Sequence, residues 1–110
     1  MATSLFTDLS DLLNDVGDIS PEPESAKVLA EYLTDIVFMT SFPDKVIPPE
    51  YNVKCHCLIH HEKCLGKIVG FINHDTDDIM WLCPKCIDHG SISNWRGTMW
   101  DLTDLGRISN

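Results

Sequence analysis

The stretch that decides the fold is residues 81–90, which read Trp81-Leu82-Cys83-Pro84-Lys85-Cys86-Ile87-Asp88-His89-Gly90. Two cysteines separated by two residues, Cys83 and Cys86, can turn both thiolates toward one ion, because the turn between them is tight. Pro84 helps to fix this turn, and Lys85 can offset the negative charge of the thiolates. The spacing therefore predicts one half of a tetrahedral metal site, for which zinc is the best-suited ion.

The other half of this site must come from upstream in the chain. Cys64 precedes Gly66, a residue that permits a sharp path of the backbone. Eighteen residues lie between Cys64 and Cys83, within the roughly 15–20 that separate the two ligand pairs of a zinc ribbon. For the fourth ligand, spacing leaves Cys55, Cys57 and His61 open, since alternation along an extended strand puts both cysteines on one face.

The segment between the two ligand turns has the pattern of a β-hairpin. Residues 65–73 are rich in Ile, Val and Phe and predict a strand, residues 74–78 predict a turn, and residues 79–82 predict the returning strand. After Cys86, the Asp-His-Gly sequence indicates a loop. The hairpin fills the gap between the ligands as a zinc ribbon requires.

Upstream of the hairpin, the sequence predicts two helices. Residues 4–16 carry apolar side chains at helical spacing with aspartates on the other face, and Gly17 is a natural stop. A second helix is expected from 23 to 41, started by prolines and Glu24 and ended at Pro43. We therefore expect an α+β fold, with a helical segment and proline-rich linker over 1–50 and a zinc-ribbon-like domain over 51–110.

Composition and charge narrow the possible partners. The chain has 110 residues, of which 44% are hydrophobic, and a net charge of −9. Most of that charge lies before residue 51, and an acidic chain repels a phosphate backbone, so nucleic acid is a disfavoured partner. No stretch reaches the roughly 18 apolar residues of a membrane span, and the N-terminus has no basic region of a secretory signal. The expected location is the cytoplasm, where five cysteines favour a metal over disulfides.

The C-terminal half also resembles a known group of sequences. Residues 81–102 are similar to the C-terminus of small, uncharacterised bacterial zinc-ribbon proteins with a CPxCGDxGxISGWQGTxWDL-like motif. The resemblance covers roughly residues 53–103, includes Cys64 with Gly66, and implies Cys55 rather than Cys57 as the fourth ligand. The sequence departs from the group at Ile87, where the group tends to have Gly, and at Arg96, where it tends to have Gln.

Three further residues, Trp95, Arg96 and Trp100, form an aromatic–basic cluster. Such clusters stack on single-stranded bases or anchor protein interfaces, although two tryptophans can equally close the core of a minimal domain. With no acid–base–nucleophile set, we expect no catalytic residues and a non-enzymatic zinc protein that binds another protein. The alternatives are a nucleic-acid-binding ribbon, which would also use Lys67 and Lys85, and a metal-dependent hydrolase with an open zinc position.

Overall fold

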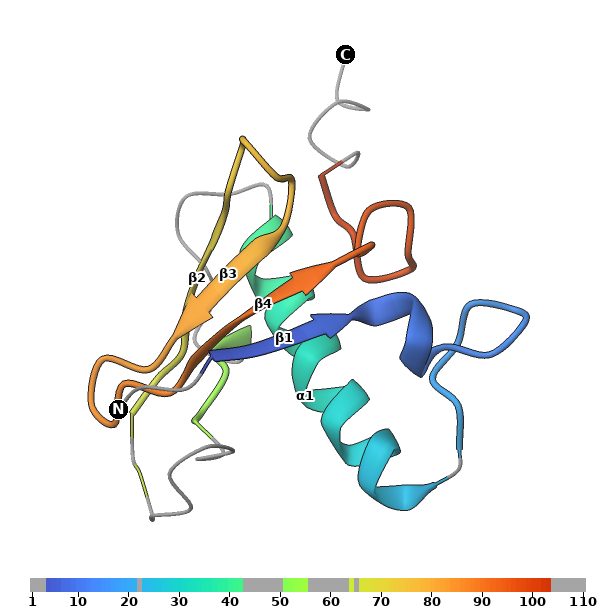
Figure 1. The fold of residues 1–110 in the computed structure, drawn as a ribbon, viewed down its shortest axis with the longest axis horizontal. Coiled ribbons are helices and arrows are strands. Elements are labelled where there is room, and N and C mark those ends of the chain that lie inside the picture. Colours follow the sequence, from blue (N-terminus) through green and yellow to red (C-terminus); the bar gives the residue numbers. More distant parts are fainter. Residues whose placement is uncertain (1–3, 22, 43–50, 56–63, 65, 104–110) are drawn as a thin grey trace.

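The structure is a computed structural model that describes residues 4–21, 23–42, 51–55, 64 and 66–103. In this part of the chain, one α-helix packs against a four-stranded mixed sheet (Figure 1). The strand order is β1-β4-β3-β2. The elements are β1 (Ser4–Asp8), the 3-10 helix η1 (Leu9–Leu12), α1 (Glu24–Ser41), β2 (Val69–Ile72), β3 (Ile79–Leu82) and β4 (His89–Ser93).

The prediction of two N-terminal helices is wrong, because residues 4–8 form strand β1. This strand pairs in parallel with β4, from Ser4 opposite His89 to Asp8 opposite Ser93. The Asp8 carboxylate then accepts hydrogen bonds from Ser10 and starts η1. The helical spacing of the apolar residues was misleading: the backbone of this segment finds its hydrogen-bond partners on a distant strand, and such tertiary pairing outweighs local pattern.

The second predicted helix is confirmed as α1, which begins after Pro23 and ends before Phe42. Its apolar stripe is wide, as a helix that packs on several neighbours requires. The stripe contacts η1, β2 and β3. Its buried residues are Ala30, Tyr32, Leu33, Thr34, Ile36, Val37, Met39 and Ser41.

The predicted hairpin is confirmed, with β2 and β3 antiparallel and Val69 opposite Leu82. The predicted loop after Cys86 is wrong beyond residue 88, because the chain continues there as β4. Gly90 explains why this strand pairs so closely with its neighbours. A Cβ atom there would overlap the Leu5 carbonyl oxygen and contact the Trp81 ring, and glycine in a strand commonly marks such a close approach of another backbone.

The core lies between α1 and the sheet and extends to the cysteine-bearing turns. Its buried residues come from α1, η1 and the sheet strands, with Trp95 directly after β4. The sheet combines β1 with three strands from the second half of the chain, while the division into two domains at residue 50 stays a prediction. Among the described residues, no helix has both the length and the apolar character needed to cross a membrane.

Candidate metal centre

Strand β3 ends in a tight turn that carries Cys83 and Cys86. The Cys83 amide donates to the Asp88 carbonyl at 2.7 Å, and the Ile87 amide donates to the Cys83 carbonyl at 2.9 Å. Ile87 has a φ of 59°, which is unfavourable for a β-branched residue and free for glycine. The turn reverses the chain into β4 and places both sulfur atoms on its inner side.

Cys55 and Cys64 come from the chain that precedes β2. The Cys55 amide donates to the Gly66 carbonyl at 3.0 Å, and Ile68 donates to the Val53 carbonyl at 2.8 Å. These bonds join residues 53–55 to residues 66–68 as a short antiparallel ladder. The Gly66 amide also donates to Cys64 Sγ at 3.3 Å, which orients that sulfur atom.

The four sulfur atoms of Cys55, Cys64, Cys83 and Cys86 all lie within 4.8 Å of one another. We call this group the cysteine cluster. The Sγ atoms of Cys55 and Cys86 are 3.4 Å apart, and those of Cys64 and Cys83 are 3.6 Å apart. A disulfide needs about 2.05 Å, whereas four sulfurs at about 2.3 Å from a tetrahedral zinc are about 3.8 Å from each other. The cysteine cluster therefore has the dimensions of a four-thiolate metal site.

Gly66 makes room for the cysteine cluster. A Cβ atom at this position would lie 2.5 Å from Cys83 Sγ, 3.2 Å from Cys64 Sγ and 3.3 Å from Lys85 Cβ. From the sequence, Gly66 was predicted to permit a sharp path of the backbone. The structure instead shows that its missing side chain is what lets the two sulfur atoms approach.

Two thiols of the cysteine cluster, Cys83 and Cys86, have pKa values shifted in opposite directions. Burial acts to raise the pKa of Cys83, but hydrogen bonds from the Cys86 and Lys85 backbone amides outweigh it and lower the pKa to about 7. The Asp88 backbone amide acts to lower the pKa of Cys86, yet burial and the neighbouring sulfurs of Cys83 and Cys64 raise it to about 11. The pKa values of Cys83 and Cys86 therefore lie well apart, and a cation between the sulfur atoms would favour the thiolate form of both.

Cys57 and His61, the other candidates for the fourth ligand, lie outside the described residues. Within the described part of the chain, the group that could hold a metal ion consists of cysteines alone. It contains Cys55, the residue that the resemblance implied. Four cysteines close together are thus shown.

The aromatic–basic cluster lies at the far end of β4. Trp95 is fully buried, and its indole nitrogen donates to the Asp77 carbonyl at 2.7 Å. Arg96 lies over the Trp95 ring, 4.6 Å from its centroid, and forms an ion pair with Asp77. Trp100 is partly buried against the core, and its carbonyl accepts from Ser41 Oγ at 3.1 Å. These contacts join the β2–β3 turn and α1 to the C-terminal segment; a binding role for the three residues stays a prediction.

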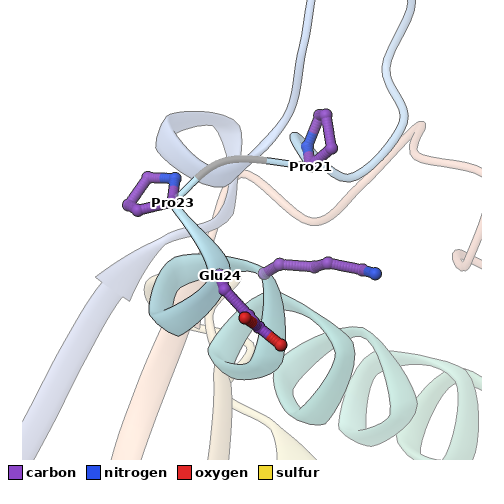
Figure 2. A pocket seen from close by; sticks show the side chains of 4 residues that line it. Pro21, Pro23 and Glu24 are labelled. Carbon is purple, nitrogen blue, oxygen red and sulfur yellow. The ribbon is translucent and has the colours of Figure 1, made fainter.

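A hollow of about 710 Å³ lies at the start of α1, lined by Pro21, Pro23, Glu24 and Lys27 (Figure 2). Its described lining combines two proline rings with the Glu24 carboxylate and the Lys27 amine, and among these described residues no second metal-ligating group stands beside Glu24. It therefore adds no chemistry to that of the cysteine cluster.

No family model matches this chain, and neither the curated proteins nor the solved structures contain a match.

Proposed function

We propose that this chain is a non-enzymatic zinc protein in which the cysteine cluster holds one structural Zn²⁺ ion, and that it acts by binding another protein. The observation that carries the proposal is the convergence of four sulfur atoms, two from the turn after β3 and two from the chain that precedes β2. A bound Zn²⁺ would supply the positive charge that lets all four thiols ionise. The cysteine cluster would hold it, and Gly66 would leave space for it.

The donor set favours a structural over a catalytic role. Structural zinc sites are closed by four protein ligands, whereas catalytic sites have three and keep a position open for water or substrate. Four thiolates fill the tetrahedron. Among the described residues, the group contains no histidine or carboxylate that would serve as a general base beside the ion.

The position of the cysteine cluster also supports a structural role. It lies where the 53–55 and 66–68 ladder meets the turn between β3 and β4, so an ion would join two segments that are distant in sequence. Cys55 and Cys83 are buried and belong to the core. Metal binding at such a place contributes directly to folding.

The test is metal analysis of the purified full-length protein with single cysteine variants. We expect one zinc per chain, and a cobalt-substituted form with the visible and near-ultraviolet bands of a tetrahedral thiolate site. Cys55→Ser, Cys64→Ser, Cys83→Ser and Cys86→Ser should each lose most of the metal. Cys57→Ser is the matched control and should retain a full equivalent.

Three outcomes would count against the proposal. A Cys57→Ser variant that loses zinc while Cys55→Ser retains it would show that the ligand set is different. A cobalt spectrum of a five-coordinate site, or one with fewer than four thiolates, would point to an open position and hence to the hydrolase alternative. Protein that carries no metal after expression with zinc, and binds none on titration, would reject the site altogether.

A further inference from the structure

The sheet has two faces, and α1 contacts one of them (Figure 1). Side chains alternate along a strand, so the residues on the helix side are buried, as Ile79, Trp81 and Ile92 are. The residues of opposite parity form what we call the outer face. Its apolar members are Phe6, Val69, Phe71, Met80 and Leu82.

This outer face is unusually apolar for a surface. Phe6 is 73% exposed, Phe71 51%, Val69 50% and Leu82 38%. The strand register places Phe6, Met80 and Phe71 in one row across the sheet, with Ser91 of β4 between Phe6 and Met80, and Leu82 and Val69 in the next row beside His89. The exposed area of these side chains is about 400 Å², comparable to the largest apolar patch of a typical monomer and often a sign of an interaction site.

Charged residues border the apolar rows at opposite ends. At the end with the β2–β3 turn, the row that follows Phe6 and Met80 is acidic. Asp8 lies opposite Ser93 in this row, and Asp78 directly precedes Ile79, which lies opposite Ile92. At the end with the cysteine cluster, Lys54 and Lys67 are exposed and paired across the short ladder, one row beyond Val69. Along the strand direction, the outer face therefore has an acidic row at one end, two mainly apolar rows in the middle and a basic row at the other end.

We infer that the outer face binds the outer face of a second copy of this chain, in an antiparallel stack. The two-fold axis lies in the plane of the interface and perpendicular to the strands, so the strands of one copy run opposite to those of the other. It lays the two apolar rows of one copy on those of the other and brings Lys67 of each copy toward Asp78 of the other. A two-fold axis along the strands would instead place acid on acid, so the charges select the antiparallel arrangement.

The area indicates how strong this dimer is. A standard stable interface takes about 800 Å² from each partner, and the apolar rows supply about half of that. The two copies also repel each other at long range, since each has a net charge of −9. We expect a reversible dimer with a dissociation constant of about 1–100 μM. This inference rests on the interaction role proposed above and gives that role a partner.

The test is sedimentation of the full-length, zinc-loaded protein from 1 to 500 μM, with zinc content and circular dichroism measured on each sample. Wild type should shift from monomer to dimer with concentration. Phe71→Thr, which suits a strand but removes the ring, should weaken the dimer at least tenfold. Val16→Thr alters a valine away from the sheet that is even more exposed (82%) and should leave dimerisation unchanged.

A charge-swap cycle tests the antiparallel arrangement independently of the apolar rows. Lys67→Glu and Asp78→Lys should each weaken the dimer about fivefold or more, and the double variant should return to within about twofold of wild type. A wild-type protein that stays monomeric at 500 μM with full zinc content overturns the inference and leaves the metal site standing. A dimer that neither Phe71→Thr nor the charge swaps affect uses another surface, which also overturns it. Loss of zinc in wild type counts against the proposed function instead.

Discussion

Replacing Gly66 by alanine tests the cysteine cluster with a single methyl group. The glycine does not adopt a left-handed φ, so alanine brings no backbone strain and the effect comes from Cβ alone. That atom would lie 2.5 Å from Cys83 Sγ, whereas non-bonded heavy atoms rest about 3.5–4.0 Å apart. The sulfur or the backbone must therefore move by about 1 Å.

A movement of that size is large for a metal site. Metal–ligand distances tolerate deviations of about 0.2 Å, so a Cys83 sulfur displaced by about 1 Å in the Gly66→Ala variant would no longer serve as a ligand. Structural zinc sites bind with about 10–16 kcal/mol, and losing one of four thiolates removes about 3 kcal/mol. We expect zinc affinity to fall about 100-fold or more.

The assay is competition for zinc against a chromophoric chelator at neutral pH, with thermal unfolding measured with and without zinc. Gly70→Ala is the matched control, because its Cβ would overlap Thr40 Oγ1 of α1 and not a sulfur atom. We expect it to reduce the stability of the fold by about 1–3 kcal/mol through overpacking, and to leave the zinc affinity of the folded protein unchanged. A Gly66→Ala protein that binds zinc as tightly as wild type, with the same gain in melting temperature, would refute the reasoning.

Three further predictions concern the metal and the C-terminal segment. Removing zinc with a chelator should lower the melting temperature and reduce the near-ultraviolet circular dichroism, because the proposed ion would join the turn after β3 to the chain that precedes β2; an unchanged melt contradicts this. Trp95→Phe should lower the free energy of unfolding by about 2–3 kcal/mol in urea, since it shrinks a buried ring and loses the hydrogen bond to Asp77; Met99→Ala, at an exposed site, is the control. Burial acts to raise the pKa of Asp101, but hydrogen bonds from Thr103 and the Gly97 amide outweigh it and lower the pKa below 3.8. The ionised Asp101 carboxylate therefore stabilises the fold above that value, and this stabilisation is lost as the pH falls through the folded pKa. The difference in free energy of unfolding between wild type and Asp101→Asn should accordingly become smaller from pH 6 to pH 2.

The sequence predicted those parts of the molecule whose structure is set by local chemistry. The second helix was readable because Pro23 and Phe42-Pro43 limit it and its apolar stripe has helical spacing. The hairpin and the approach of Cys64 to the Cys83 turn followed from spacing alone. That Cys55 completes the group rested on the resemblance, since alternation along a strand treats Cys55 and Cys57 alike.

The parts that sequence analysis missed depend on contacts between distant segments. Residues 4–8 have a spacing that suits a helix, and nothing local shows that β4 provides a strand to pair with. Phe6 illustrates the error: a helix would have buried it, and the strand leaves it on the outer face. The one usable signal was Gly90, which a loop does not require but a closely approached strand does.

The parallel pairing of β1 with β4 has a consequence for how the chain is made. Ser4 must meet His89, so the two partners are separated by most of the sequence. At a synthesis rate of about 5–20 residues per second, β1 waits several seconds for its partner strand. The sheet can close only after residue 93 has been synthesised, and contacts between residues so far apart in the sequence also make folding slow. A chain stopped before residue 89 would leave the backbone N–H and C=O groups of β1 without the partner strand β4, which makes incomplete products candidates for aggregation or degradation.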